Sequence, residues 1–190
     1  MARAGITVDR LVEAGAQLAD ETGFEQLTGA ALARHFSVKL ASLYSHVPSL
    51  DDLKSRIALF ALQELADRAT DALAGRTGKD ALAALANVYR DYARAHPGRF
   101  AAARHPVSAE RAAESAGGRL VRATAAVLRG YGLPDTEHAH AIRLLGGFFM
   151  GYVTLESAGG FSHGAPGSDM SWSRSLDALD AMLRHWPSAA

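Results

Sequence analysis

The chain has 190 residues, of which 48% are hydrophobic and 21% are charged, a composition typical of a globular protein rather than a disordered one. It contains no cysteine, which excludes disulfides and thiolate metal clusters. Acidic and basic residues balance to a formal net charge of zero, so only a local cationic surface could bind a polyanion. The longest apolar stretch, Leu144 to Leu155, is too short to span a bilayer, and no signal-peptide core follows Met1. We therefore expect a cytoplasmic protein without a membrane partner.

The first 48 residues predict three short helices. Thr7 can cap the first helix, which follows the three- and four-residue spacing of a buried face and should end at Gly23. A second helix should begin after Thr28, and a third should run from about Lys39 to His46. Three short helices, with a tight turn between the second and the third, form a helix-turn-helix, whose third helix is small enough to enter the major groove of DNA.

The remaining residues predict a larger helical body. Ser49 can cap the next helix, and Asp51 and Asp52 suit its positive N-terminal end. Helices are expected at about 50–74, 80–95, 119–131, 136–158 and 170–186, with a short helical turn at 100–104. The segment from Gly159 to Ser168 should form a mobile loop. No segment shows the strict alternation of a strand, so the sequence predicts an all-α protein of eight or nine helices.

Cationic residues gather in one part of the predicted head. Residues 26–50 contain no acid but include Arg34, His35, Lys39 and His46. Acidic residues lie on both sides of this window, so the head as a whole is not basic. A local excess of positive charge of this kind is compatible with DNA binding.

Several segments of the head resemble the signature of the TetR family of transcriptional regulators. The matching segments are Thr28–Ala33, Phe36–Val38, Ser42–Ser49 and Asp51–Leu53. Their order and spacing follow the family from Val8 to about Leu53. The resemblance implies a helix-turn-helix DNA-binding domain at residues 1–48 and a helical ligand-binding and dimerisation domain at residues 49–190. The plainer reading is a three-helix subdomain without a DNA partner, in which Tyr44 is a core aromatic.

The resemblance also implies a set of DNA-contacting residues. These are Thr28, Lys39, Leu40, Ser42, Tyr44, His46 and Lys54. Lys39, Leu40 and Ser42 would lie at the exposed start of the recognition helix and face the bases. Tyr44 and His46 would lie nearer its end and pack against sugar and phosphate. Contacts to the DNA backbone set the register, and only the groove-facing residues specify the sequence.

This chain departs from the family pattern at several positions of the head. Ser37 stands at the turn where glycine is usual, and a non-glycine residue in the left-handed conformation costs about 1 kcal/mol. Lys39 replaces the usual serine or threonine cap of the recognition helix. Leu50 replaces a lysine that often contacts phosphate, for which Lys54 could substitute, whereas Thr28 is expected to reach a phosphate as in the family. These departures imply a weaker grip on phosphate than usual.

The body resembles a C-terminal subgroup of the same family, which carries a Trp-His-Gly-type motif. The similar segments are Ala86–Phe100 and Met150–Phe161, and histidine is common at the position of Met150. The resemblance implies that the last two helices form a dimer interface and that the middle helices surround an apolar ligand cavity. For the cavity we predict Phe60, Tyr89, Tyr92, Phe100, Phe149 and Met150. For the interface we predict Gly147, Gly151, Leu155, Leu176, Leu179 and Leu183.

The residues of the last two helices leave alternatives open. The helix predicted at 136–158 is apolar on more than one face, as expected of a helix that serves both a core and a partner. Gly147 and Gly151 are one helical turn apart, and could either let another helix approach or only leave room for large neighbouring side chains. The leucines of the final helix follow a spacing that is more often that of a core. A two-fold dimer would place two heads on neighbouring major grooves.

Enzyme motifs are missing from the sequence. It has no GxGxxG, GxSxG or HExxH pattern, and Gly75–Asp80 lacks the spacing of a phosphate-binding loop. His138 and His140 lie on different faces of a helix, so shared metal ligation is not expected, and each is predicted to be solvated. We therefore predict no enzymatic activity, no cofactor and no metal site.

Together these features favour a homodimeric repressor controlled by a ligand. It would bind a palindromic double-stranded DNA operator and leave it when an unknown small apolar ligand stabilises a conformation that no longer fits DNA. An activator, or a regulator without a ligand, is compatible with the same residues. The alternative from another class is a helical ligand-binding or enzymatic module with a vestigial head. The acid-free window, together with Tyr44 and His46, favours the DNA-binding reading.

Overall fold

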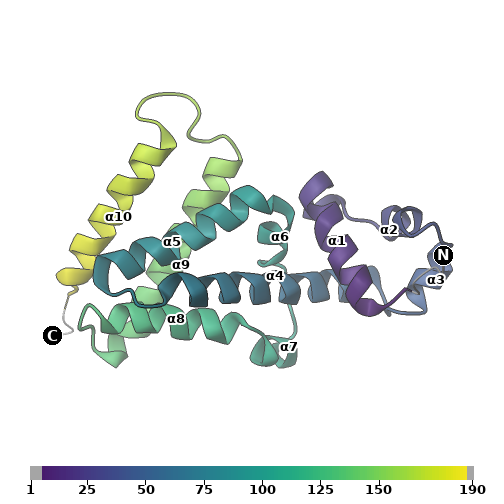
Figure 1. Ribbon diagram of the computed structural model, residues 1–190, viewed down its shortest axis with the longest axis horizontal. Helices are drawn as coiled ribbons and strands as arrows, with labels where there is room; N and C mark the ends of the chain where they lie inside the picture. The colour runs from purple at the N-terminus through teal and green to yellow at the C-terminus, as the bar shows by residue number, and fades with distance from the viewer. Residues whose placement is uncertain (1–5, 188–190) are drawn as a thin grey trace. The chain divides into compact units, whose positions relative to one another are not determined.

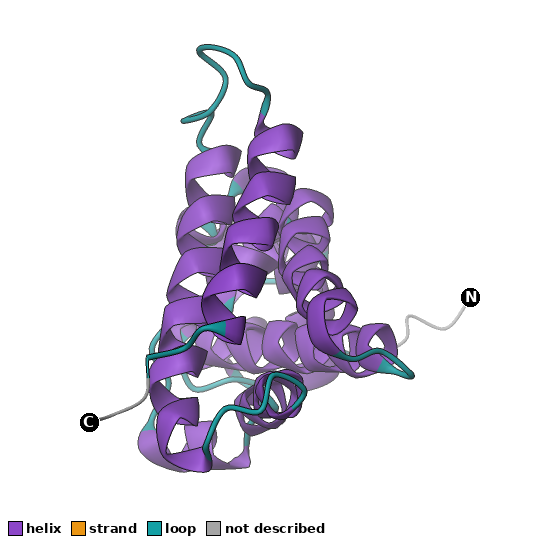
Figure 2. Cartoon of the chain, turned by 90° about the vertical axis from the view of Figure 1, so that its left-hand side faces the viewer, coloured by secondary structure: helices purple, strands orange, loops and turns teal. Residues whose placement is uncertain are grey.

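The computed structural model describes residues 6–187, and within them it contains helices and loops but no strand (Figure 1). The elements are α1 (Val8–Thr22), a 3-10 helix (Phe24–Gln26), α2 (Gly29–His35), α3 (Leu40–Tyr44), α4 (Leu50–Leu73), α5 (Gly78–Ala95), α6 (Pro97–Ala102), α7 (Ala109–Glu114), α8 (Gly117–Arg129), α9 (Asp135–Ser157) and α10 (Ser168–Arg184). The predicted all-α fold class is confirmed (Figure 2). No helix in this part of the chain combines the length and the apolar character that crossing a membrane requires.

The described residues form more helices than the eight or nine predicted. The additional elements are short, since α6 and α7 contain six residues each. A helix of this length has too few turns to display a periodic apolar face, and α7 has no buried residue at all. α10 begins at Ser168, two residues before the predicted start.

Side-chain caps fix the starts of three helices, and the sequence predicted two of them, at Thr7 and Ser49. Each hydroxyl oxygen accepts a hydrogen bond from the backbone N–H three residues later, which satisfies a donor that the helix itself leaves free. The pairs are Thr7 with Arg10 at 3.3 Å, Thr28 with Ala31 at 3.2 Å and Ser49 with Asp52 at 3.0 Å. Gly23 ends α1 with a φ of 95°, a conformation that glycine adopts without strain.

The chain folds as two compact units. The first unit contains residues 6–64 and 95–116, and the second contains residues 65–94 and 117–187. The first unit is therefore larger than the three-helix head, because it also includes the first part of α4 together with α6 and α7.

One apolar core holds the first unit together. It includes Leu11, Phe24, Leu27, Leu32, Leu43, Val47, Leu53, Ile57 and Ala102. These residues come from α1, the 3-10 helix, α2, α3, α4, α6 and the connections between them, so the head and α6 share one core. Leu43 is the only buried residue of α3, which leaves the other side chains of this helix at the surface.

Gly98 allows the backbone of α6 to approach the end of α1. A Cβ atom at Gly98 would lie 2.0 Å from the carbonyl carbon and oxygen of Ala19, a distance at which no side chain fits. Next to this contact, the Asp20 carboxylate accepts the backbone N–H of Arg99 at 2.8 Å and lies 3.2 Å from Nδ1 of His96. The contact between α1 and α6 is thus made by backbone atoms and fixed by one carboxylate.

An ion-pair network in the second unit ties α5 to α9 and to the start of α10. The Arg90 side chain is 7% exposed, and its guanidinium donates to both carboxylate oxygens of Glu156, at 2.5 and 2.9 Å. Asp169 lies 2.8 Å from the same guanidinium, and Arg94 contacts both acids. The hydrogen bond from Arg90 lowers the pKa of Glu156 to about 2, despite the opposing effect of burial.

His138 lies in the core of the second unit, and the prediction that it is solvated is wrong. Its side chain is buried, and Nε2 lies 3.1 Å from the carbonyl oxygen of Leu133. The physical reason is the turn before α9, which brings a backbone carbonyl onto the imidazole ring and gives it a partner away from water. His140 is exposed, as expected.

Candidate nucleic-acid interface

The exposed face of α3 contains most of the predicted DNA-contacting residues. Leu43 anchors the helix in the core, and the residues around it stay at the surface. The predicted residues that are exposed here are Lys39, Leu40, Ser42, Tyr44 and His46. The structure therefore brings these five side chains to the surface of one short helix and its two ends.

Tyr44 is an exposed aromatic residue rather than a core residue. Its side chain is 40% exposed, and it lies over Gly29 at the start of α2. A Cβ atom at Gly29 would come within 2.9 Å of the Tyr44 hydroxyl oxygen and 3.0 Å of Leu40 Cδ1. Gly29 thus leaves the space that both side chains occupy, a role that the sequence analysis did not assign to it.

Thr28 lies at the surface beside this pair of side chains. Its hydroxyl oxygen accepts the N–H of Ala31 at 3.2 Å. A hydroxyl has one donor and two acceptor positions, so the Thr28 proton can still be donated to a phosphate oxygen. Capping and phosphate contact are compatible in the same side chain.

Lys54 differs from the other predicted residues because it is engaged within the first unit. Its side chain is only 15% exposed, its Nζ lies 3.5 Å from a carboxylate oxygen of Glu25, and the ammonium group sits 5.0 Å from the ring centre of Phe24. A contact between Lys54 and phosphate would therefore compete with the carboxylate of Glu25 for the same ammonium group.

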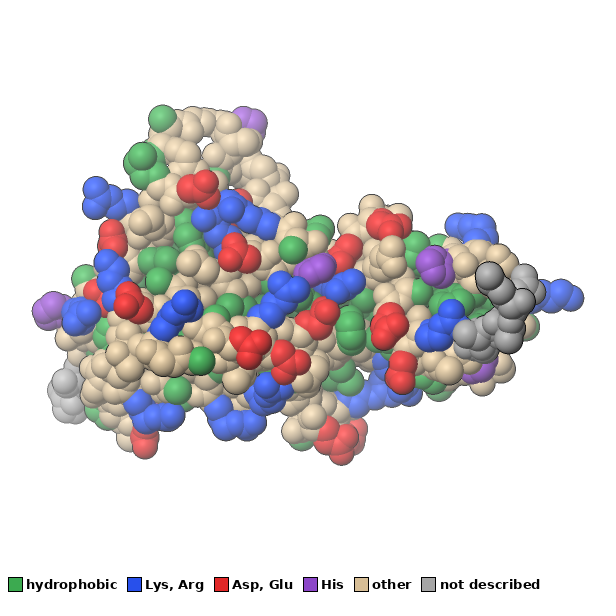
Figure 3. Space-filling view, in the orientation of Figure 1, with side chains coloured by type: hydrophobic (Ala, Val, Ile, Leu, Met, Phe, Trp, Pro, Cys, Tyr) green, Lys and Arg blue, Asp and Glu red, His purple; other side chains and the backbone are tan. Residues whose placement is uncertain are grey.

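The cations nearest in sequence to the recognition helix are unpaired. In the described part of the chain, no acidic group forms an ion pair with Arg34 or Lys39, and both are exposed. Elsewhere, Lys and Arg side chains are interspersed with Asp and Glu side chains over the face drawn in Figure 3. Unpaired cations keep their full charge available for a polyanion, so the α2–α3 region is suited to DNA despite the neutral total charge.

Ser37 occupies the turn between α2 and α3 in the left-handed conformation, as predicted. Its φ is 54°, and it is the only non-glycine residue with a positive φ in the described chain. The backbone N–H of Val38 donates to the Ala33 carbonyl at 2.9 Å, which closes the turn around it. Ser37 therefore holds a backbone conformation that glycine would adopt with less strain.

Ser37→Gly is expected to raise the free energy of unfolding by about 1 kcal/mol, because it removes the left-handed strain of a side chain that is exposed. Urea unfolding followed by circular dichroism measures this change. Ser45→Gly is the matched control, because Ser45 already has a helical φ of −75°. This substitution should lower the free energy of unfolding instead. Equal destabilisation by both substitutions would contradict the assignment.

The predicted ligand-cavity residues are divided between the two units. Phe60 and Phe100 belong to the first unit, whereas the other four belong to the second. Within the second unit, the rings of Tyr89 and Phe149 are in contact, with centroids 5.5 Å apart. Burial raises the pKa of Tyr89 to about 12, so its hydroxyl stays protonated in a largely apolar environment.

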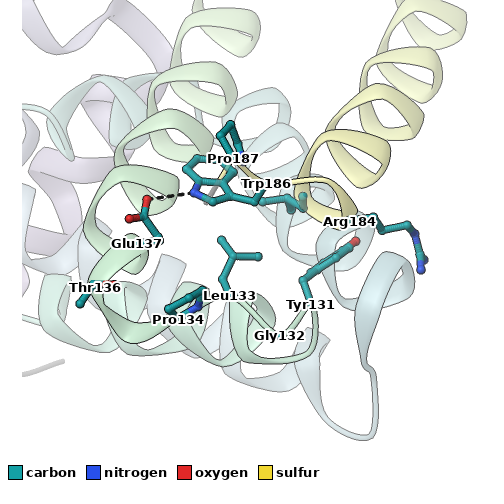
Figure 4. Close-up of a pocket in the computed structure, with 10 residues that line it drawn as sticks. Tyr131, Gly132, Leu133, Pro134, Thr136, Glu137, Arg184, Trp186 and Pro187 are labelled. Carbon is teal, nitrogen blue, oxygen red and sulfur yellow. Dashed lines mark hydrogen bonds between the residues drawn. The ribbon is translucent and has the colours of Figure 1, made fainter. Parts of the chain in front are cut away.

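A different pocket of about 370 Å³ lies in the second unit, between the α8–α9 turn and the end of α10 (Figure 4). It is lined by Tyr131, Gly132, Leu133, Pro134, Thr136, Glu137, Leu183, Arg184, Trp186 and Pro187. The Trp186 indole donates to the Glu137 carboxylate at 3.0 Å, and the Tyr131 hydroxyl donates to Asp180 at 2.7 Å. None of the six predicted cavity residues lines this pocket. In the described part of the chain, no cluster of His, Asp and Glu residues could hold a metal ion.

The predicted interface residues fall on two different faces. Leu176, Leu179 and Leu183 are buried within the chain itself, which agrees with the core reading of their spacing. Gly147 and Gly151 lie on an exposed face of α9, where an added Cβ would meet no described atom within 4 Å. These glycines therefore do not make room for neighbours in their own chain. Two large residues on the same face are exposed, Leu144 at 43% and Leu155 at 55%.

Comparison with known families and proteins agrees with this architecture. Residues 82–179 match the family described as Tetracyclin repressor-like, C-terminal domain. An uncharacterized HTH-type transcriptional regulator of Mycobacterium tuberculosis is 33% identical over 158 residues, which cover 82% of this chain and 72% of that protein. A second uncharacterized HTH-type regulator, from Bacillus subtilis, is 35% identical over 101 residues, or 53% of each chain.

Solved structures share the fold. A variant of TetR from Acinetobacter baumannii, in complex with minocycline, superposes with a TM-score of 0.75 at 20% identity and covers 97% of this chain and 100% of its own. A possible TetR family regulator from Streptomyces coelicolor gives a TM-score of 0.71 at 23% identity, with 95% of this chain and 100% of that chain covered.

The helix-turn-helix with an exposed recognition helix, followed by a helical body, defines a DNA-binding transcriptional regulator. The family model matches more than half of the chain, and the mycobacterial relative matches most of it. The chain therefore belongs to the TetR family of transcriptional regulators.

Proposed function

We propose that this regulator is a homodimeric repressor that binds a palindromic DNA operator through α3 and is released by a small apolar ligand. The observation that carries the proposal is the distribution of large exposed apolar side chains. In the described chain they are Leu40, Tyr44, Val121, Leu144, Leu155 and Met170. Two of them lie on α3 and three on α9 and α10, so the exposed apolar surface concentrates where DNA and a second subunit would bind.

The DNA contact would combine phosphate and base contacts. The exposed hydroxyls of Thr28 and Tyr44 would donate to phosphate oxygens, while Lys39, Leu40 and Ser42 would begin the helix that enters the groove. His46 follows at the other end of α3 and adds a further contact to the backbone. No enzymatic activity is proposed for this chain.

Tyr44→Phe is expected to weaken operator binding by about ten- to a hundredfold, since a net hydrogen bond to a charged acceptor contributes roughly 1.5–3 kcal/mol. The substitution removes one exposed oxygen, so the melting temperature should hardly change. Titration of a labelled operator, selected from a random-sequence DNA pool, measures the affinity.

Tyr131→Phe is the control for Tyr44→Phe, because the Tyr131 hydroxyl already donates to Asp180 within the second unit. It should alter stability but not the affinity for DNA. Normal operator binding by Tyr44→Phe would show that its hydroxyl does not contact phosphate.

The dimer would form through the outward faces of α9 and α10. Leu144, Gly147, Gly151 and Leu155 follow a spacing of three and four residues along α9, which places them on one face. Met170 adds a side chain that is 63% exposed at the start of α10. The glycines would let the α9 backbone of a partner approach closely, between larger side chains on each side.

Gly151→Glu is expected to raise the dimer dissociation constant at least about thirtyfold, because it buries a carboxylate without a counter-ion at the proposed interface. The monomer should fold normally, since Gly151 is exposed and a Cβ added there meets no described atom within 4 Å. Sedimentation equilibrium measures the dissociation constant. Val121→Glu, on the exposed face of α8, should leave it unchanged. A wild-type monomer at micromolar concentration would exclude the proposed dimer.

A ligand would act by binding one conformation of the dimer more tightly than the other. The buried rings of Tyr89, Tyr92 and Phe149 give this part of the second unit the apolar interior that such a ligand would enter, with Met150 next to Phe149 in the sequence. The fold is compatible with such a role, because the related fold of the Acinetobacter protein binds minocycline. A screen for small molecules that release the operator tests this part of the proposal, and a release that Tyr89→Ala abolishes would support it.

A further inference from the structure

The recognition helix exposes apolar side chains at the position that meets DNA in the proposed function. Leu40 is 44% exposed and Ala41 is also exposed, and they directly follow Lys39. Successive residues of an α-helix are turned by about 100°, so Ala41 lies on the side of α3 opposite the buried Leu43. Neither Leu40 nor Ala41 has a side-chain hydrogen-bonding group, so neither can read a donor or acceptor of a base edge.

The next residue on the same face of α3 has a hydroxyl group, but its proton is already donated within the helix. Ser45 lies one turn after Ala41, and its hydroxyl donates to the Ser42 carbonyl at 2.7 Å. The outermost strip of α3, Ala41 and Ser45, therefore consists of small side chains, which allows the helix to lie close to the floor of the major groove. Leu40 lies beside this strip, with its terminal Cδ1 methyl group near Gly29 and 44% of its surface exposed.

The residue types of α3 also limit which bases it can read directly. Adenine is usually read by Asn or Gln, and the amino group of cytosine by Asp or Glu. Residues 39–46 contain none of these four types. Thymine alone presents a methyl group in the major groove, and apolar side chains are its usual partners.

We propose that α3 recognises thymine methyl groups through Leu40 and Ala41, so that each operator half-site carries at least one thymine opposite the start of this helix. The inference rests on the proposed DNA binding and goes beyond it, because it states which base the helix selects. Burial of one methyl group should contribute about fourfold to affinity.

Replacement of single thymines by uracil tests the proposal. Deoxyuridine pairs as thymidine does but lacks the 5-methyl group. The probe is the duplex selected by the full-length protein from a random-sequence pool, resynthesised with one uracil at a time. Binding of the wild-type protein should weaken about fourfold at one or more thymines of each half-site and stay unchanged at the others.

The variant Leu40→Ala tests whether the Leu40 side chain contacts a thymine methyl group. With this variant, at least one of the sensitive thymines should become insensitive to uracil, which is the outcome expected of a direct contact. Val121→Ala, which removes exposed apolar surface from α8, is the matched control and should retain every uracil effect. If Leu40→Ala does not fold, as judged by circular dichroism, Leu40→Met is the second variant. It keeps an apolar contact, so it should change the size of the affinity loss caused by uracil without abolishing that loss.

The outcomes separate this inference from the proposed function. If no duplex is enriched by the protein, both fail together. If a duplex is enriched but no uracil position weakens binding, only the thymine readout is overturned. It is also overturned if every uracil effect persists unchanged in a folded Leu40→Ala variant, because the methyl groups would then contact other residues.

Discussion

Gly98→Ala is expected to destabilise the first unit by about 3 kcal/mol or more. The added Cβ would lie 2.0 Å from backbone atoms of Ala19, and backbone atoms cannot rotate away as a side chain does. Overpacking against side chains usually costs about 1–3 kcal/mol, and this contact leaves less room for adjustment. The chain would have to separate α6 from α1, which would also disturb the hydrogen bond from the Arg99 N–H to Asp20. Thermal and urea unfolding measure the loss.

Gly146→Ala provides the matched control for Gly98→Ala. Gly146 lies in the middle of α9, and an added Cβ there would meet no described atom within 4 Å. Alanine should stabilise this helix by about 0.5–1 kcal/mol, since it loses less backbone entropy than glycine. If Gly98→Ala unfolds like the wild-type protein, α6 and α1 do not make the backbone contact described above.

Glu156→Gln is expected to destabilise the second unit by about 3 kcal/mol. The substitution removes the carboxylate that receives two hydrogen bonds from Arg90, and the guanidinium remains largely buried. Removing one partner of a buried pair typically costs about 3–5 kcal/mol. Asp169 still lies 2.8 Å from Arg90, so the expected loss is at the lower end of this range.

The Glu156 carboxylate should also make the free energy of unfolding depend on pH. Its pKa is about 2 in the folded chain and 4.5 in the reference state, so the folded protein binds the proton more weakly. The stability from Glu156 is fully present above about pH 4.5 and is lost as the pH falls towards 2, a total of about 3 kcal/mol. The difference in stability between the wild type and Glu156→Gln should therefore shrink over this interval.

Asp177→Asn is the control for both measurements on Glu156. Asp177 pairs with Lys79 at 2.7 Å, but the two side chains are 44% and 49% exposed. An exposed pair contributes about 0–1 kcal/mol, so this variant should differ little from the wild type at any pH. A Glu156→Gln protein as stable as Asp177→Asn at neutral pH would mean that the Arg90 network adds little to the fold.

Features that depend on a few neighbouring residues could be predicted from the sequence. The caps at Thr7, Thr28 and Ser49 use an oxygen three residues from its donor, and the left-handed turn at Ser37 follows from its place between two short helices. The exposure of Tyr44 follows from its position next to Leu43 on one helix. Residue type and spacing along the chain were sufficient for the caps at Thr7 and Ser49 and for Tyr44, and the resemblance to the family supplied the cap at Thr28 and the turn at Ser37.

Features that join distant segments could not be predicted in this way. Asp20 and Arg99 are 79 positions apart, and Arg90 and Glu156 are 66 positions apart. No spacing rule connects such pairs, since only the packed helices bring them together. The burial of His138 has the same origin, because it depends on a turn folding back over the ring.

The Arg90 network has a consequence for the segment 158–167 that joins α9 to α10. One guanidinium holds Glu156 just before this segment and Asp169 just after it, so both ends are fixed independently of what lies between. The entropy of closing a loop grows only slowly with its length, by about 0.6 kcal/mol per doubling. This connection should therefore tolerate inserted residues, and it offers a place for a peptide tag or a fluorescent label that leaves the flanking helices in register.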